Sequence, residues 1–471
     1  MLQDADALPQ LIGDYKPVDQ WQVHMNRLFY RLRGDQVRRY YQTFASADYR
    51  LAHALAADYV EQVTKRDAAR AAKAQTLTVM EWGPGNGNLA ACFLSHVQRL
   101  DPKGLVYPRL RYVMVDWEQA VIDAALRHPM LASHRDRIES VTGSIDQLHA
   151  IPDGSIDRIV CNELWNDQPT KLMSRQGAEI EEEFQRPNLS EALHARIQDW
   201  TGFVRAFEAS DVEALKTFPP FFDDLVWERE YRAVEWKDVP FRKTITEFLR
   251  RIDEQVVVPV NIGAFATLKE AKRLLAPDAV GLSSFDAGTM DLKVLNDPEK
   301  PCSGQFGGQQ SFMVNFVLVE AVAKHLELGR TTVESQREFV GRCLGTNVVT
   351  VMDLLAAHPS AGSNMEPWEQ DRLILKTIRA LNESYESPYQ HPLEFPISHE
   401  MPADERESLQ ALLLGLKRNG VPDTVAYLTE EELTRAAKDL EAIGYDEQTL
   451  LVALSAPPAP VDYFHALVNP R

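Results

Sequence analysis

Short apolar runs alternate with helical patterns through the first third of the chain. Four such runs stand at residues 76–83, 110–117, 137–144 and 155–163. Apolar residues with helical spacing fill about 88–100, after the first run, and the segment EQAVIDAALRHP, after the second. Short strands that alternate with helices are typical of a parallel sheet with right-handed crossovers. The pattern therefore predicts an α/β fold built on a Rossmann-like sheet.

The segments on either side of this pattern are predicted to be largely helical. Residues 18–70 carry apolar side chains at three-to-four spacing, and the chain after about residue 335 is predicted to be all helix. Residues 170–250 are polar, and we expect a helical insertion at about 170–255. Its acidic run, interpreted as a solvated helix face, consists of Glu179, Glu181, Glu182 and Glu183. The expected parts are a helical N-terminal segment, an α/β domain with the insertion and a helical C-terminal domain, over residues 1–75, 76–330 and 335–471.

The alternating pattern resumes after the insertion. Residues 265–288 predict a helix followed by a strand, and residues 310–322 predict one more strand or a strand–helix junction. Further along, Thr429 and Glu432 form a capping-box pattern that predicts the start of a helix, which closes at Gly444. A loose tail is expected around Pro457, Pro458 and Pro460.

Composition limits the classes of function. At 471 residues the chain is too long for one simple core, and 45% hydrophobic with 25% charged residues is ordinary for a globular protein. The net charge of −19 argues against a nucleic-acid partner, because proteins that grip phosphates need a cationic face. No stretch approaches the roughly 18–20 apolar residues that cross a bilayer, and the N-terminus has no signal or transit pattern. We therefore expect a cytoplasmic protein without a membrane partner.

Four cysteines are spread along the chain without a Cys-x-x-Cys pair. This spacing excludes a disulfide scaffold and a common zinc knuckle, so we expect reduced, buried thiols and no metal site. The four are Cys92, Cys161, Cys302 and Cys343.

Three glycines follow the first apolar run, in the stretch VMEWGPGNGNLAACFL. Gly83, Gly85 and Gly87 fit neither the dinucleotide fingerprint, whose third glycine falls one residue later, nor a Walker A loop, which ends in Gly-Lys-Ser/Thr. Their spacing, E-x-G-x-G-x-G, fits the strand-to-loop element of class I S-adenosyl-L-methionine (SAM)-dependent methyltransferases. Such glycines let the backbone turn sharply beside a ligand at the carboxyl end of a strand. We predict that this loop, with Pro84, binds SAM and that Glu81 accepts from its ammonium group; an ordinary structural turn is the alternative.

Two further turns follow strands of the same predicted sheet. Asp116 ends the second strand, where a carboxylate can accept both ribose hydroxyls, and Trp117 comes next. Ser144, Ile145 and Asp146 follow the third strand, where adenine would lie and where Asp146 could take its exocyclic amine. The structural alternatives are a solvated Asp116 and a helix-capping Ser or Asp. Because the three turns arrive in order at the carboxyl ends of strands, together they predict a crevice for SAM.

The fourth strand ends in VCNELWNDQPT. Asn162 and Glu163 are expected to project from its tip toward the methyl group of SAM. The methyl donor is already activated, so catalysis consists mainly of aligning the acceptor and removing its proton, a role open to Glu163 or Asp167. The alternative is that Asn162 and Glu163 only fix the loop by hydrogen bonds.

Three of these stretches resemble the motifs of a known family. EWGPGNGNLA, VDWEQAV and NELWNDQPT are similar to motifs of the MidA-type SAM-dependent methyltransferases, which include mitochondrial complex I assembly factors. The resemblance runs from about 25 to 330, and it implies a class I methyltransferase fold with protein arginine methylation as the activity. DAGTMDL and QQSFMVNF stand where the family has two further motifs.

Some family positions differ in this chain. The family's Asp after Asn-Glu-Leu-Phe aligns with Asn166, which leaves Asp167 as a neighbouring substitute, and Asn315 replaces a late Asp. We therefore expect a SAM-dependent methyltransferase that acts on a protein side chain or a small acceptor, with a homodimer as one option. Two alternatives stay open: an inactive SAM-binding assembly or interaction factor, and a nicotinamide-dependent oxidoreductase.

Overall fold

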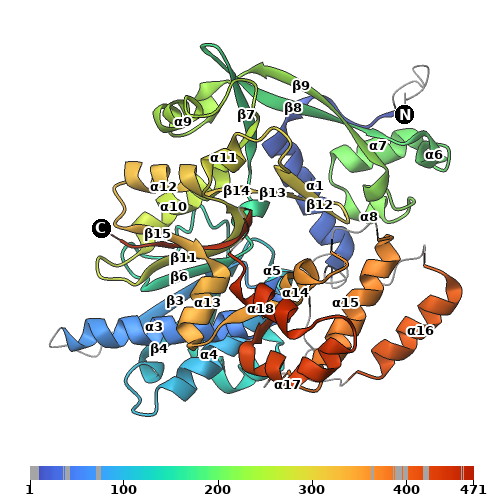
Figure 1. Ribbon diagram of the computed structural model, residues 1–471. Coiled ribbons are helices and arrows are strands. Elements are labelled where there is room, and N and C mark those ends of the chain that lie inside the picture. The colour runs from blue at the N-terminus through green and yellow to red at the C-terminus, as the bar shows by residue number, and fades with distance from the viewer. Residues whose placement is uncertain are drawn as a thin grey trace.

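An eight-stranded sheet forms the centre of the structure, a computed structural model. The described residues are 10–34, 37, 43–69, 76–361, 365–385, 387, 395, 401–416, 424–457, 459 and 461–470. The strands of the central sheet are β3 (Leu77–Trp82), β4 (Leu110–Asp116), β5 (Ile138–Thr142), β6 (Arg158–Asn162), β11 (Gly281–Thr289), β14 (Val314–Asn315), β15 (Thr331–Ser335) and β18 (Asp462–Val468). Their order is β15-β18-β11-β6-β3-β4-β5, with β14 beside β11, and β18 runs in the direction opposite to the other seven strands (Figure 1). The predicted α/β fold with a Rossmann-like sheet is confirmed.

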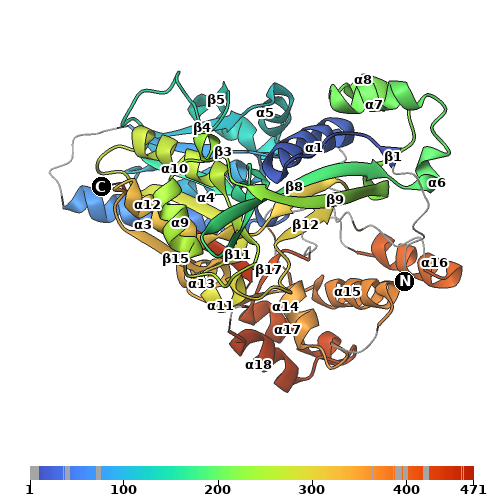
Figure 2. The same cartoon turned by 90° about the horizontal axis from the view of Figure 1, so that it is seen from above.

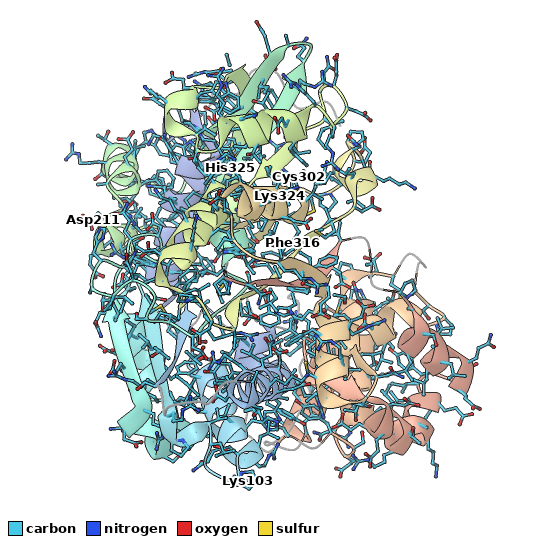
Figure 3. The ribbon with its side chains drawn as sticks, turned by 90° about the vertical axis from the view of Figure 1, so that its left-hand side faces the viewer. Lys103, Asp211, Cys302, Phe316, Lys324 and His325 are labelled. Atoms are coloured by element: carbon cyan, nitrogen blue, oxygen red, sulfur yellow. The ribbon has the colours of Figure 1, made fainter. Side chains whose placement is uncertain are left out.

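Helices cover both faces of this sheet (Figure 1). The helices on one face are α3 (Arg50–Ala68), α4 (Asn88–Leu100) and α13 (Gln336–Leu344), and those on the other are α10 (Ile262–Leu274) and α12 (Phe316–His325). One apolar cluster joins Leu55, Phe93 and Phe339 from the first set, while a second cluster joins Phe265 and Val319 from the other. Figure 3 labels Phe316, Lys324 and His325, which mark the two ends of α12. The sheet therefore separates two apolar cores.

The N-terminal segment is helical, as predicted. It consists of α1 (Val18–Arg33), the short α2 (Phe44–Ala47) and α3, preceded by β1 (Gln10–Leu11) and β2 (Lys16–Pro17). The predicted helices after the first two strands of the central sheet are confirmed by α4 and α5 (Gln119–Leu126). Short 3₁₀ turns, which were not predicted, complete the connections: η2 (Tyr107–Arg109), η3 (Pro129–Arg137) and η4 (Trp165–Asp167). The predicted helix–strand pair at 265–288 is confirmed by α10 and β11, and the strand–helix junction at 310–322 by β14 and α12.

The predicted helical insertion at about 170–255 is wrong in its secondary structure. An antiparallel sheet dominates this segment, made by β7 (Lys171–Gln176), β8 (Glu179–Leu189), β9 (Leu225–Ala233) and β10 (Val258–Val260) together with β1 and β2. Only short helices accompany it: α6 (Glu191–His194), α7 (Trp200–Glu208), α8 (Val212–Leu215) and α9 (Arg242–Leu249), with η5 (Phe222–Asp224) and η6 (Trp236–Asp238). In Figure 1 this second sheet lies above the central one.

The acidic run on β8 explains the error. Glu182 is buried and lies 2.8 Å from the ammonium nitrogen of Lys171, which also lies 3.0 Å from a carboxylate oxygen of Asp19. Glu183 is buried as well and accepts a hydrogen bond of 2.9 Å from the hydroxyl of Tyr231. These carboxylates are paired inside a sheet, so they do not form the solvated helix face that the polar composition indicated.

The chain after residue 335 is not all helix, and the expected loose tail at its end is wrong. After these helices the chain re-enters the central sheet as β18, which inserts between β11 and β15. The helical unit therefore forms the connection between β15 and β18. The unit contains α13, α14 (Val351–Ala357), α15 (Pro367–Leu381), α16 (Ala403–Leu414), α17 (Glu430–Glu441) and α18 (Glu447–Ser455), and the paired strands β16 (Val348–Thr350) and β17 (Tyr427–Thr429). Figure 2 shows α14–α18 grouped on one side of the molecule. The limits of the domains remain a prediction.

Smaller elements complete the description. Thr429 and Glu432 form the predicted capping box at the start of α17, and Pro458 and Pro460 lie outside the described residues. A hairpin of β12 (Ser303–Phe306) and β13 (Gln309–Phe312) and the short helix α11 (Leu292–Leu295) follow β11. All four cysteines are free; two are buried, as expected, but Cys302, labelled in Figure 3, and Cys343 are partly exposed. None of the described helices is both long and apolar enough to span a membrane.

A buried polar network holds β18 in place. The His465 ring on β18 lies 2.8 Å from the hydroxyl of Ser283 on β11 and 3.2 Å from the carboxylate of Glu334 on β15. Ser283 also accepts a hydrogen bond of 2.5 Å from Arg158 on β6, whose guanidinium pairs with Asp58 on α3 at 2.9 Å. Burial lowers the pKa of His465, so its ring is neutral there. These polar contacts thus link β18 to β11 and β15 directly, and to β6 and α3 through Ser283 and Arg158.

Replacing Asp58→Ala is expected to destabilise the protein by about 3–5 kcal/mol, because it leaves the guanidinium of Arg158, with a fully buried side chain, without its carboxylate. The measurement is the free energy of unfolding in urea. Glu61→Ala is the control on the same helix, because Glu61 pairs with Lys65 at the surface and its loss is expected to cost less than about 0.5 kcal/mol. Equal costs for the two variants would contradict this account of the network.

Candidate cofactor and active site

The predicted site residues come together at one edge of the central sheet. The glycine loop follows β3, Asp116 ends β4, Ser144 follows β5 and Asn162 ends β6. These strands are parallel, so their carboxyl ends meet at the same edge. Backbone hydrogen bonds connect the turns there: the amide of Gly83 donates to the carbonyl of Val115 and that of Gly143 donates to the carbonyl of Asp116, each over 2.9 Å.

The glycine loop needs its glycines for two different reasons. Gly83, Gly85 and Gly87 have φ angles of +71°, +50° and +78°, a region that side chains with a Cβ seldom adopt. A Cβ on Gly87 would also lie 2.6 Å from the carbonyl oxygen of Ala125 on α5, whereas a Cβ on Gly85 would meet nothing within 4 Å. The amide of Gly87 donates to the carbonyl of Pro84 over 2.8 Å, which closes the turn. The loop therefore keeps open space at Gly85 while it packs tightly at Gly87.

Two asparagines fasten the loop to the segment before α3. The side-chain amide of Asn86 donates to the carbonyl of Ser46 over 2.9 Å. Asn88 stands where a dinucleotide fingerprint has its third glycine, and its buried amide donates to the carbonyls of Ala45 and Asp48 over 2.7 and 2.8 Å. The side chain at this position thus anchors α2 against the loop.

Glu81 lies beneath the loop and is buried. Its carboxylate accepts a hydrogen bond of 3.0 Å from the hydroxyl of Tyr112 on β4, and burial raises the pKa of Glu81 to about 8. A carboxyl group in this position is largely protonated at neutral pH until a cation approaches it. Its predicted contact with the SAM ammonium stays a prediction.

Asp116 and Trp117 border the same edge. Burial raises the pKa of Asp116 to about 6, and one of its carboxylate oxygens accepts from the amide of Glu118 over 2.9 Å. The Trp117 ring is 45% exposed, and the guanidinium of Arg31 on α1 lies 5.4 Å from the ring centroid. A carboxylate and an accessible aromatic face therefore lie next to each other, as a ribose and an adenine would need.

The turn after β5 contributes one exposed polar pair. The hydroxyl of Ser144 donates to the carboxylate of Asp146, whereas Ile145 is buried in the apolar core on the α10 face. The predicted contact of Asp146 with adenine stays a prediction, since its carboxylate is held by Ser144 and faces solvent.

Glu163 has a strained backbone at the tip of β6. Its φ angle is +49°, and its amide donates to the carbonyl of Phe285 on β11 over 2.6 Å. Its buried carboxylate accepts from the amide of Phe44 on α2 over 3.3 Å and from the side-chain amide of Asn162 over 3.5 Å. The Oδ1 atom of Asn162 is buried and has no hydrogen-bond partner among the described residues. Strain that neighbouring contacts maintain is frequent at functional positions.

Asp167 lies next to this tip and is held by side chains from two elements that are distant in the sequence. Its carboxylate accepts from the hydroxyl of Tyr30 on α1 and from the side-chain amide of Gln309 on β13. Burial raises the pKa of Asp167 to about 7, and burial together with Asp167 raises the pKa of Tyr30 well above its usual value. Asp167 can therefore exchange a proton near neutral pH, whereas Tyr30 stays protonated.

Asp286 fixes the loop that carries these groups. It is fully buried in the second half of β11 and accepts from the backbone amides of Trp165 and Asn166, each over 3.2 Å. Burial raises the pKa of Asp286 to about 7. The sequence offered a signal here, because DAGTMDL begins with Asp286, but no role was predicted for it. Gln309 likewise begins the stretch QQSFMVNF, again without a predicted role. Tyr30 and Phe44 had no such signal, since they reach the site from distant segments.

Residues 54–281 match a family model described as "Putative S-adenosyl-L-methionine-dependent methyltransferase". The match supports a SAM-dependent methyltransferase. The prediction of SAM as the cofactor is confirmed by this family match. The matched range contains the glycine loop, Asp116 and the tip of β6.

The chain also matches solved structures at low sequence identity. Two crystal structures of COG1565-superfamily proteins from Burkholderia thailandensis, one native and one with bound S-adenosyl-homocysteine, are each 16% identical, with 78% of this chain and 84% of theirs covered and TM-scores of 0.45 and 0.46. A SAM-dependent methyltransferase from Aquifex aeolicus is 11% identical, with 58% of this chain and 81% of that chain covered and a TM-score of 0.25. No curated protein matches the chain. Among the described residues, no group of three or more His, Cys, Asp or Glu side chains is arranged to hold a metal ion.

Replacing Gly87→Ala is expected to weaken SAM binding by at least about tenfold and to lower the melting temperature, because the new Cβ would collide with the Ala125 carbonyl 2.6 Å away. Gly177→Ala, in the turn between β7 and β8, is the control: it has the same unfavourable φ region without a collision, and it is expected to cost only about 1 kcal/mol of stability and to leave SAM binding unchanged. Calorimetric titration with SAM and thermal unfolding measure both. Identical losses in the two variants would show that the close approach at Gly87 is unimportant.

Replacing Glu81→Gln is expected to stabilise the ligand-free protein at pH 8 by on the order of 2 kcal/mol and to have little effect at pH 5. The folded-state pKa of Glu81 is raised to about 8, so wild-type stability is lost as pH rises toward that value, and a neutral Gln escapes this loss while still accepting from Tyr112. Urea unfolding at both pH values measures the difference. The exposed Glu139 on β5 provides the control, Glu139→Gln, and a gain for Glu81→Gln that is independent of pH would refute the explanation.

Proposed function

We propose that this chain transfers the methyl group of SAM to a nitrogen atom of an acceptor bound beside Glu163 and Asp167. The observation that carries the proposal is a set of buried side-chain oxygens that lack a donor among the described residues: one at the end of β6, one in the segment after it and one on Gln309, which contacts Asp167 of that segment. Within the described part of the chain, the side-chain oxygens of Asn162, Asn166 and Gln309 are buried without a hydrogen-bond partner. Buried acceptors are normally satisfied, so these favour a ligand rich in N–H groups.

The residues at the sheet edge fit SAM. The turn at Gly83–Gly87 leaves open space at Gly85, where the backbone could approach the amino-acid half of the cofactor. Asp116 offers a carboxylate to the ribose hydroxyls, and Trp117 offers an accessible ring beside it. When bound, SAM supplies a methyl group that is already activated by a positive sulfonium. The carboxyl group of Glu81 and the free oxygen of Asn162 favour such a cationic ligand.

The chain's own contribution to the chemistry is alignment and proton removal. Glu163, held by Phe44 and by its strained backbone, is placed to orient an N–H group of the acceptor. Asp167, with a pKa near neutrality, is placed to accept the proton that leaves the methylated nitrogen. Tyr30 and Gln309 hold the carboxylate of Asp167 in one orientation.

The class of acceptor follows from this chemistry and from the resemblance. A guanidinium group presents five N–H donors, which suits two carboxylates and several free amide oxygens. The MidA-type resemblance favours an arginine side chain of a protein, and a small guanidine or amine is the alternative with the same chemistry. An inactive SAM-binding assembly factor would bind SAM and transfer nothing, so binding and transfer must be measured separately.

Binding is tested first, by calorimetric titration of the wild-type protein with SAM and with NADH. We expect binding of SAM and none of NADH. Binding of NADH alone would favour the oxidoreductase alternative and overturn the proposal.

The variants Glu163→Gln and Asp167→Asn are each expected to lower methyl transfer by about a hundredfold or more while SAM binding stays within a few-fold of wild type. Transfer is measured by adding the protein and SAM with a labelled methyl group to a cell lysate and counting the label incorporated into the acceptors. In wild type the rate is expected to rise with pH through about 7, because ionised Asp167 is the active form, and this rise is expected to be lost in Asp167→Asn.

The matched control is Asp153→Asn, whose carboxylate is exposed and pairs with Arg273 at the surface. It is expected to keep both the rate and the pH profile. Unchanged labelling in the two site variants would refute their roles, and SAM binding without any labelling in wild type would favour the inactive binding factor.

A further inference from the structure

The antiparallel direction of β18 brings a tyrosine to the site. Since β18 runs against the parallel strands, its first residues lie at the edge where their carboxyl ends meet. Tyr463 on β18 pairs with Ala287 near the end of β11. On the other side of β11, and two residues earlier, Phe285 pairs with Asn162 on β6. A residue from the end of the chain thus reaches the tip of β6.

Tyr463 shares a neighbour with Glu163. The ring of Phe44 meets the Tyr463 ring edge-on, with 4.9 Å between centroids, while the amide of Phe44 donates to the Glu163 carboxylate over 3.3 Å. The neighbouring carboxylate of Glu163 and, second, burial raise the pKa of Tyr463 well above its usual value. Tyr463 therefore keeps its proton beside a carboxylate that the proposed reaction uses.

The hydroxyl of Tyr463 differs from those of the buried tyrosines around it. Tyr30 and Tyr112 donate to Asp167 and Glu81, and the hydroxyl of Tyr427 accepts from Gln336 over 2.9 Å. By contrast, the half-buried Tyr463 has no hydrogen-bond partner for its hydroxyl among the residues that the structure describes. A tyrosine hydroxyl that lies next to a carboxylate and lacks a protein partner is suited to a ligand.

We propose that Tyr463 contacts the reacting groups, its hydroxyl oxygen accepting a hydrogen bond from the nitrogen that receives the methyl group. This inference rests on the proposed function. With Glu163 it would provide two acceptors for one nitrogen and so align its lone pair with the methyl group. The helical unit supports this alignment through Tyr427. Its ring stacks on the ring of Phe44, the residue that contacts both Tyr463 and Glu163, with 4.9 Å between ring centroids and 28° between planes.

The test compares two ligands and needs no knowledge of the acceptor. Sinefungin carries an amine where SAM carries its methylsulfonium, whereas S-adenosyl-homocysteine carries nothing at the methyl position. In Tyr463→Phe we expect calorimetric titration to give roughly tenfold weaker binding of sinefungin and unchanged binding of S-adenosyl-homocysteine, because only sinefungin presents an N–H group to the hydroxyl.

Tyr427→Phe is the matched control, since it also removes a hydroxyl from a ring that packs on Phe44, but one that Gln336 already occupies. It is expected to leave the ratio of the two affinities unchanged. Equal changes for both ligands in Tyr463→Phe, or none for either, would overturn the inference while leaving the proposed function intact. If wild type binds neither ligand, the proposed function itself fails.

Discussion

The rest of the structure depends on the insertion of β18 between β11 and β15. This strand closes the sheet, and its backbone pairs on both sides over most of its length. Because β18 lies between two other strands and His465 is buried there, the polar groups of His465 must be satisfied within the sheet, and Ser283 and Glu334 meet this need. The same insertion ties the helical unit to the core and fixes where Tyr463 lies.

A second consequence concerns the balance of charge at the site. Several carboxyl groups are buried at one edge, where the described part of the chain places no cationic side chain against them, and burial raises their pKa toward neutrality. Such an arrangement is unfavourable for the empty protein and favourable for a cationic ligand, because the ligand supplies the missing charge. The α1 helix and the β12–β13 hairpin then serve to orient Asp167, through Tyr30 and Gln309.

The sequence predicted those parts of the site that local patterns encode. The strands before Gly83 and Asp116 are short apolar runs with glycine or a carboxylate at their ends, so both the sheet and the turns follow from neighbouring residues. β8 was missed because its carboxylates are buried and paired with groups such as Lys171, which no local pattern reveals. β18 was missed because its strand partners lie far away along the chain, beyond a long helical stretch. For the same reason Tyr30 and Tyr463 could not be assigned to the site before the fold was known.

The position of β18 also has a meaning for the order in which the protein is made. A ribosome releases β3, β4, β6 and β11 long before residues 462–468, so the sheet waits with a gap between β11 and β15 while the helical unit emerges. Two strand edges stay unpaired during this time, and such edges attract other strands. The sheet can therefore be completed, and the tyrosine that we propose for the active site put in place, only after the helical unit has been synthesised.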